Sequence, residues 1–303
     1  MTDFIGDIHG HADKLEQLLT KLGYTSNNGT WSCPGRKVLF VGDYIDRGPQ
    51  IIRTLQIVKG MVDSGNAIAL MGNHEYNALC FHFQEREGGH LRKHLIKNVI
   101  QHYQTLLQFQ NRQAEYEAYL EWFKTLPLFY ETDSFRAVHA CWDDEQIRFL
   151  KTALQNDRLT DSLIYESAQK GFPLNDAIEI TLKGKEMKMP PGLTFTDKDG
   201  TVRREIRIKW WADPLVSTYK SLSVELLDNL PDTIIEPGSI TTTDFYDIER
   251  KSVFFGHYWL KGEPVLYEAN ICCLDYSVAK EGYLVAYRFD GGDKLDKDNL
   301  VYV

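Results

Sequence analysis

Three short segments near the start of the chain combine metal-ligating side chains with glycine. They are Gly-Asp-Ile-His-Gly at 6–10, Gly-Asp-Tyr-Ile-Asp-Arg-Gly at 42–48 and Gly-Asn-His-Glu at 72–75. Each follows an apolar run, so each is expected at the end of a strand. Similar apolar runs precede two later histidines. The ligand candidates are therefore Asp7, His9, Asp43, Asn73, His139 and His257.

The spacing and chemistry of these residues favour a site for two metal ions. Residues i and i+2 of an extended chain point the same way, so Asp7 and His9 can hold one ion. The carboxylate of Asp43 has two oxygens and can bridge two ions. Mixed oxygen and nitrogen ligands without thiolates suit Mn, Fe, Zn or Co, whereas calcium and a structural zinc site are disfavoured. We expect two divalent or trivalent ions, with Mn as the first choice.

The alternative is that these residues only form turns. A single Asp or His at the end of a strand is usually a turn or cap residue. Here three such segments occur in order within the first 75 residues. Their joint occurrence favours a shared site. His139 and His257 alone would be explained equally well as core histidines. They become stronger ligand candidates because they complete the set of metal-ligating residues.

The segments resemble those of the calcineurin-like metallophosphoesterases. Gly-Asn-His-Glu and Asp-Arg-Gly together point to the phosphoprotein phosphatase branch. Residues 35–49 are especially similar to small bacterial members, which include PrpE-type phosphatases, symmetrical diadenosine tetraphosphatases and the phosphatase domain of bacterial polynucleotide kinase-phosphatase. The resemblance covers residues 1–80, 135–141 and 252–258.

This resemblance implies a ligand set and a fold. One metal would be held by Asp7, His9 and Asp43, and the other by Asp43, Asn73, His139 and His257. The implied fold class is α/β, a metallophosphoesterase sandwich of two packed mixed β-sheets flanked by helices. The site would lie at the edge where the strands end.

Three residues beside the ligands are candidates for catalysis. His74 directly follows Asn73, and an imidazole titrates near neutral pH, which suits an acid that protonates a leaving oxygen. Asp46 resembles the family's partner of this histidine, and the planar fork of Arg47 matches two phosphate oxygens. A surface salt bridge is the alternative for Arg47 and Asp46. We expect Arg47, Asn73 and His74 to contact the phosphate.

Alternating strands and helices must position these residues. Strands are expected at 4–5, 37–41 and 67–71, separated by amphipathic helices at 13–22 and 51–62. Ligands bind at the carboxyl ends of such strands in parallel sheets. Further strands are expected at 135–140, 253–255, 271–275 and 283–289.

The remaining chain is expected to form inserts within a single domain, 1–303. Residues 76–126 are predicted to be helical, and residues 143–215 form a variable insert on the substrate side. The second insert would contain a hairpin at 195–208 around Asp199-Gly200.

One departure from the resemblance concerns a second phosphate-binding arginine. Trp-Ala-Asp-Pro at 211–214 resembles a block of eukaryotic-type phosphatases, but the arginine that follows it there has no counterpart before Phe255. Arg203, Arg204 and Arg207 are upstream alternatives. Their other interpretation is a solvated hairpin face.

Composition limits the class of protein and its partners. The net charge of −9 argues against an extended nucleic-acid surface or an acidic membrane surface. No apolar run reaches the length of a membrane span, no signal peptide is evident, and the five cysteines lack zinc-type spacing. We expect a cytoplasmic protein with reduced thiols and a phosphorylated substrate.

The leading functional hypothesis is a metal-dependent phosphatase that hydrolyses phosphomonoesters, including a serine/threonine-type protein phosphatase. A hydroxide bridging the metals would attack phosphorus directly. The alternative enzyme hydrolyses dinucleoside polyphosphates such as diadenosine tetraphosphate, or nucleotide and nucleic-acid end phosphates. A non-catalytic scaffold is disfavoured because it would be expected to lose ligands or His74.

Overall fold

The structure separates the chain into two compact units. This computed structural model describes residues 1–196, 200, 202–240 and 242–303. The first unit comprises residues 1–182 and 251–303, and the second comprises residues 183–250. The predicted insert at 143–215 overlaps both units, and the single-domain assignment stays a prediction.

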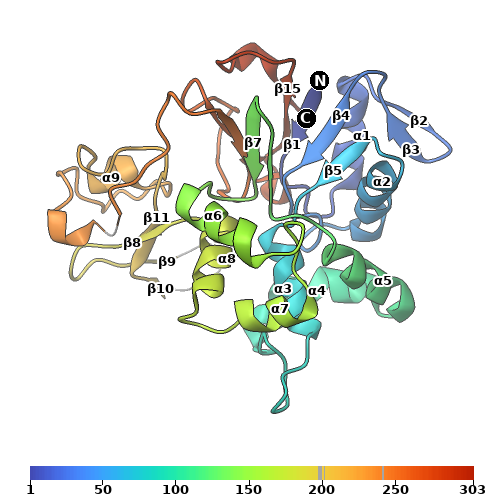
Figure 1. Cartoon of the computed structure of the whole chain (residues 1–303), viewed down its shortest axis with the longest axis horizontal. Helices are drawn as coiled ribbons and strands as arrows, with labels where there is room; N and C mark the ends of the chain where they lie inside the picture. Colours follow the sequence, from blue (N-terminus) through green and yellow to red (C-terminus); the bar gives the residue numbers. More distant parts are fainter. Residues whose placement is uncertain (197–199, 201, 241) are drawn as a thin grey trace. The chain divides into compact units, whose positions relative to one another are not determined.

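The first unit contains a mixed six-stranded sheet (Figure 1). In spatial order its strands are β14 (Asp275–Tyr276), β15 (Tyr283–Phe289), β1 (Thr2–Ile5), β4 (Lys37–Phe40) and β5 (Ala67–Ala69), with β16 (Leu300–Tyr302) beside β15. Strands β1, β4 and β5 are parallel to one another, whereas β15 runs antiparallel to β1. The three parallel strands therefore end at one edge, as the sequence predicts.

A second mixed sheet lies in the same unit. In spatial order its strands are β13 (Ile271–Cys273), β12 (Ser252–Phe255), β7 (Phe135–Val138) and β6 (Phe129–Glu131). Strand β12 is parallel to both β13 and β7, and β6 is antiparallel to β7. The strands that precede His139 and His257 are thus neighbours.

Aromatic side chains pack the two sheets against each other. The ring of Phe4 on β1 stacks on Phe254 of β12, with centroids 3.6 Å apart. Phe135 of β7 meets Phe4 edge-on at 4.9 Å, and it meets Phe289 of β15 at 5.7 Å. Such rings bury large apolar areas, which makes this layer the core of the unit. The predicted pair of packed mixed sheets flanked by helices is confirmed.

Helices flank these sheets. In the first unit they are α1 (Ala12–Lys21), α2 (Ile51–Asp63), α3 (Asn73–His82), α4 (Ile96–Phe109), α5 (Gln113–Phe123), α6 (Asp144–Ala153) and α7 (Asp161–Ser167), and α8 (Pro173–Lys183) ends at the unit boundary. The bounds of α1 and α2 confirm the helices predicted at 13–22 and 51–62. Leu15, Leu18 and Leu19 are buried on one face of α1, as their spacing requires. Within the described residues, no helix is both long and apolar enough to cross a membrane.

The prediction that residues 76–126 are helical is wrong for residues 83–95. This segment, between α3 and α4, is irregular apart from isolated pairing of Gln84 with His90. Gly88 and Gly89 have φ values of +95° and +91°, a backbone conformation that a helix cannot include. Helices α3, α4 and α5 occupy most of the rest of the range, apart from turns at 110–112 and 124–126.

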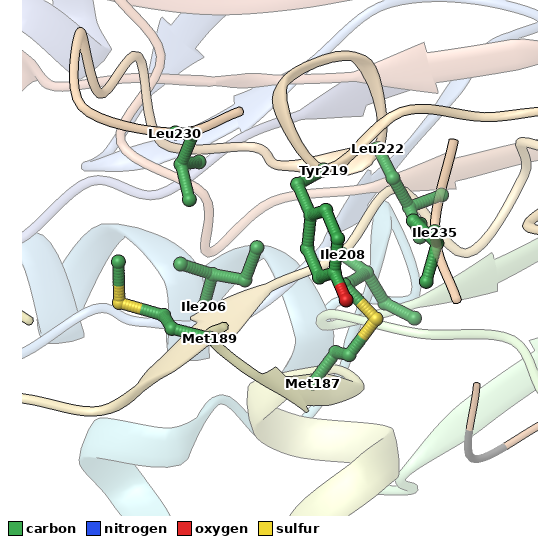
Figure 2. Close-up of a cluster of buried hydrophobic side chains, with 8 residues drawn as sticks. All are labelled: Met187, Met189, Ile206, Ile208, Tyr219, Leu222, Leu230 and Ile235. Atoms are coloured by element: carbon green, nitrogen blue, oxygen red, sulfur yellow. The ribbon is translucent and has the colours of Figure 1, made fainter. Parts of the chain in front are cut away.

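The second unit has its own apolar core (Figure 2). It contains β8 (Glu186–Lys188), β9 (Phe195–Thr196), β10 (Val202–Arg203), β11 (Glu205–Arg207) and α9 (Tyr219–Leu222). Met187, Ile206, Tyr219 and Leu222 are buried together in its core, as Figure 2 shows.

The predicted hairpin at 195–208 is only partly observed. Strands β9 and β10 pair antiparallel, but β11 pairs with β8 instead of extending the hairpin. The reason is that Ile206 and Met187, which are register partners, share the buried core. Most of the predicted turn, including Asp199, lies outside the described residues.

Candidate active site

The ends of strands from both sheets meet at the predicted ligands. Asp7 follows β1, Asp43 follows β4, and Asn73 begins α3 after β5. The N–H of His9 donates to the carbonyl of Asp43 at 2.9 Å, which joins the first two segments. Across the sheets, the backbone N–H of His257 donates to Asp7 Oδ2 at 3.0 Å. All six predicted ligands are buried in one place.

Glycine is required where the segments approach one another. A Cβ on Gly72 would lie 2.2 Å from Asp43 Oδ1, and a Cβ on Gly256 would lie 1.9 Å from Asp7 Oδ1. Both distances are below any real contact. The glycines that flank the ligands in the sequence therefore leave room for carboxylate oxygens.

Several site residues have the left-handed backbone conformation. Positive φ values occur at His9 (46°), Asp43 (56°), Asp46 (67°), Arg47 (68°) and His257 (73°). Such conformations cost of the order of 1–3 kcal/mol each and persist where surrounding contacts hold them. Such a concentration of strained backbone at one place is typical of functional sites.

Two groups of potential ligands share Asp43. The first contains His9, Asp43 and His74, and the second contains Asp43, His139 and His257, with ligand atoms in each group within 4.8 Å of one another. His9 Nε2 lies 3.6 Å from Asp43 Oδ2, and His139 Nε2 lies 3.5 Å from Asp43 Oδ1. Each carboxylate oxygen of Asp43 therefore faces a different group.

Asn73 belongs to the second group. Its Oδ1 lies 3.0 Å from His139 Nε2 and 2.8 Å from His257 Nδ1. An amide oxygen between two imidazole nitrogens is a suitable arrangement around an ion. The predicted contact of Asn73 with phosphate stays a prediction.

The buried polar atoms fit bound metal. His9 Nδ1 donates to the carbonyl of Ile45 at 3.0 Å, which leaves Nε2 with a lone pair directed at Asp43. His9 Nε2 and Asp7 Oδ1 are buried without hydrogen-bond partners among the described residues. Asp7 is outside both ligand groups, but its unsatisfied oxygen lies at the same site. A cation would satisfy both atoms, because buried polar groups otherwise carry a desolvation cost.

Burial and neighbouring charges shift the pKa values of the ligands. Burial and the carboxylates of Asp275 and Asp43 raise the pKa of Asp7 well above its ordinary value. Burial also raises the pKa of Asp43, but positive charge on His139 and His74 outweighs it and the net shift is downward. Burial and charge on His74 lower the pKa of His9, which keeps that imidazole neutral. A bound cation would in turn favour the ionised form of Asp7.

Asp46 and His74 form a close buried pair. Asp46 Oδ2 lies 2.5 Å from His74 Nδ1, and the two side chains are 2% and 3% exposed. His74 Nε2 is directed toward the ligands, 3.9 Å from Asp43 Oδ2. Burial raises the pKa of Asp46, but His102 and His74 outweigh it through charge and hydrogen bonds, so the pKa lies well below its usual range. The structure thus brings together the two residues that the sequence pairs.

Arg47 packs against a tryptophan that the sequence analysis did not single out. Its guanidinium carbon lies 4.3 Å from the ring centroid of Trp259, and its Nε is buried without a hydrogen-bond partner among the described residues. The same ring lies 5.4 Å from that of His9 and 5.8 Å from Lys280 Nζ. Trp259 follows the candidate ligand His257 by two positions, which is the signal that would have identified it.

Glu75 connects two of the three segments. Its carboxylate accepts hydrogen bonds from the backbone N–H groups of Asp43 (2.9 Å), Tyr44 (2.8 Å) and Gly72 (3.0 Å). Burial and the charge of Asp43 raise its pKa to about 8. Glu75 therefore has a structural role in holding the loop that carries Asp43.

Other residues that the sequence analysis missed lie on the helical insert. His102 and Thr105 of α4 contact the carboxylate of Asp46 at 2.7 and 2.6 Å. No glycine or strand-end pattern surrounds them. The alternative arginines Arg203, Arg204 and Arg207 lie in the second unit.

Comparisons with known proteins place this geometry in context. The family model described as calcineurin-like phosphoesterase matches residues 2–257. A bis(5'-nucleosyl)-tetraphosphatase PrpE [asymmetrical] of Oceanobacillus iheyensis is 32% identical over 139 residues, 46% of this chain and 54% of that protein. The protein of the same name from Geobacillus thermodenitrificans is 45% identical over 73 residues, 24% of this chain and 30% of that protein. The chain thus spans about half, or less, of the length of these curated relatives.

A solved structure supports the fold. A protein serine/threonine phosphatase of Saccharomyces cerevisiae matches with a TM-score of 0.52 and 12% sequence identity. The match covers 100% of this chain and 78% of that one. At this identity, the likeness concerns the fold alone.

Proposed function

Because the chain belongs to the calcineurin-like phosphoesterase family, we propose that it is a metal-dependent phosphoric ester hydrolase. The observation that supports this most directly is the pair of buried ligand groups that share Asp43. The proposed reaction site also contains a histidine paired with a carboxylate and an arginine without an acidic partner among the described residues. Such groups can stabilise the phosphate charge and donate a proton in phosphoryl transfer.

We assign the ligands as the resemblance implies. Asp7, His9 and Asp43 would hold one ion, and Asp43, Asn73, His139 and His257 the other. When bound, the two ions supply Lewis-acid stabilisation of the phosphate charge and activate water. Manganese is the proposed metal, since the proposed ligands of this site include both oxygen atoms and imidazole nitrogens.

His74 is the proposed general acid. Its Nε2–H would donate a proton to the leaving oxygen, while its Nδ1–H donates to Asp46 Oδ2. The ionised Asp46 stabilises the protonated imidazole and holds its orientation. Arg47 would bind the phosphate through its guanidinium, whose direction is held by stacking on Trp259.

Removal of metal tests the proposal. Protein stripped with a chelator should be inactive, and Mn²⁺ should restore hydrolysis of p-nitrophenyl phosphate better than Mg²⁺, because Mg²⁺ prefers oxygen ligands. Elemental analysis would verify removal before the assay. Full turnover by metal-free protein in excess chelator would contradict the proposal.

A second candidate function is hydrolysis of substrates with more than one phosphate, such as dinucleoside polyphosphates. The names of the bacterial relatives favour this class over phosphoproteins. The specific observation is that Arg47 and Lys280 both lie beside Trp259, and neither forms a salt bridge within the described residues. The carboxylate of Asp275 accepts hydrogen bonds from the backbone N–H groups of Trp259 at 2.8 Å and Ser277 at 3.0 Å. It therefore holds together the two chain segments that carry Trp259 and Lys280.

Replacing Lys280 distinguishes the two substrate classes. Lys280→Gln should raise the KM for diadenosine tetraphosphate roughly tenfold, because a hydrogen bond between charged groups is lost. It should change kcat/KM for p-nitrophenyl phosphate by less than about twofold, since that substrate has one phosphate. The control is Lys294→Gln, which removes the same charge from an exposed lysine. Equal effects of Lys280→Gln on both substrates would argue against the second candidate.

A further inference from the structure

The carboxylate of Asp46 has hydrogen-bond partners on both oxygens. Oδ2 faces His74 Nδ1 at 2.5 Å. Oδ1 faces His102 Nδ1 at 2.7 Å and accepts from Thr105 Oγ1 at 2.6 Å. The backbone N–H of Asp46 also donates to Thr105 Oγ1, at 3.0 Å. One aspartate therefore connects the loop at 42–48 and helix α3 to helix α4.

The hydrogen bonds continue from α4 to α5. His102 Nε2 lies 2.7 Å from the hydroxyl of Tyr116. Because a carboxylate only accepts, His102 must donate to Asp46 through Nδ1, and His102 Nε2 shares a second hydrogen bond with the hydroxyl of Tyr116. Tyr116 stacks on Phe109 of α4 with centroids 4.8 Å apart. Asp46, His74, His102, Thr105 and Tyr116 are each at most 4% exposed.

These contacts determine the direction of the carboxylate. The terminal torsion of aspartate is broad, so an Asp46 bonded through Oδ2 alone would turn readily. Two donors on Oδ1 restrict that rotation and keep Oδ2 directed at His74. The carboxylate that contacts His74 is therefore also held by α4, and His102 connects it to Tyr116 of α5.

We propose that His102 is a positioning residue for His74, acting through Asp46, and that the helical insert thereby controls proton donation to the leaving group. This inference rests on the proposed function of His74. The competing interpretation is that His102 only contributes to packing between α4, α5 and the core. The two interpretations differ in whether the effect of His102 depends on His74.

A double-mutant cycle separates them. His102→Leu should lower kcat for an alkyl phosphate roughly 10–100-fold, the effect of misplacing a catalytic group, and lower kcat for p-nitrophenyl phosphate less. His102→Asn should recover most of the rate, since its amide nitrogen replaces the Nδ1 donor. In protein that already has His74→Asn, adding His102→Leu should cause almost no further loss.

The matched control is His82→Leu. The ring of His82 packs beside His102 and Tyr116, with centroids 5.8 Å and 5.0 Å away. Among the described residues, His82 has no hydrogen bond or ion pair with Asp46. It should leave the ratio of alkyl to aryl rates unchanged. A loss from His102→Leu that persists in the His74→Asn background, or one that His82→Leu reproduces, would overturn the inference.

A readout without turnover keeps the inference separate from the proposed function. Proton NMR of the wild-type protein should contain a downfield Nδ1–H signal from His74, assigned by its loss in His74→Asn. His102→Leu should shift or broaden this signal, whereas His82→Leu should not. If no phosphoester is hydrolysed, the proposed function fails, and an unchanged His74 signal in His102→Leu would refute the positioning role on its own.

Discussion

Asp43→Asn should abolish nearly all activity and release at least one metal ion. Asp43 is the residue common to both ligand groups, with one oxygen facing His9 and the other facing His139. Asparagine keeps the shape but removes the negative charge and one acceptor oxygen. Metal catalysis contributes several kcal/mol to such reactions, so the loss should be roughly 10³-fold or more.

Elemental analysis and phosphatase kinetics on the same preparation would measure both effects. Asp46→Asn is the matched control, because Asp46 carries the same charge three residues away and contacts His74 rather than the metal ligands. It should retain both ions. An Asp43→Asn protein with two tightly bound ions and normal rates would show that the shared-ligand assignment is wrong.

The proximity of the candidate metal ligands was predictable because their geometry is encoded locally. Each follows a strand, and parallel strands such as β1 and β4 deliver their ends to one edge. The flanking glycines carried the same information, since a side chain at Gly72 or Gly256 would collide with a ligand carboxylate. An apolar strand followed by glycine and a candidate ligand is thus a pattern that can be recognised at several places in the sequence.

The positioning residues were not predictable in this way. His102 and Thr105 are polar residues on the buried face of α4, and the sequence pattern of that helix gives no sign of their contacts with Asp46. Their proximity depends on how α4 packs beside the loop at 42–48, which is a tertiary property. The irregular segment 83–95 was also missed in the sequence analysis. Its composition resembles that of the helices around it, apart from Gly88-Gly89, which interrupts the helix.

His74→Asn should retain both metal ions and still lose much of its turnover. Asn73 is the proposed ligand at the adjacent position, and the His74 side chain contacts Asp46, which orients it for the proposed proton donation. The expected reduction in kcat is roughly 10²–10⁴-fold on an alkyl phosphate, the usual contribution of a general acid. Asp46→Asn should have a milder effect, since the imidazole remains but is less well oriented.

The choice of leaving group makes this prediction specific. p-Nitrophenolate is a weak base that departs without full protonation, so the loss caused by His74→Asn should be much smaller on p-nitrophenyl phosphate than on an alkyl phosphate. A residue that only supported the metal ligands would slow both substrates equally, because both need the same stabilisation of the phosphate. Metal analysis with kinetics on the two substrates therefore separates proton donation from metal binding at neighbouring positions. An equal loss on both substrates, or loss of a metal ion, would exclude His74 as the general acid.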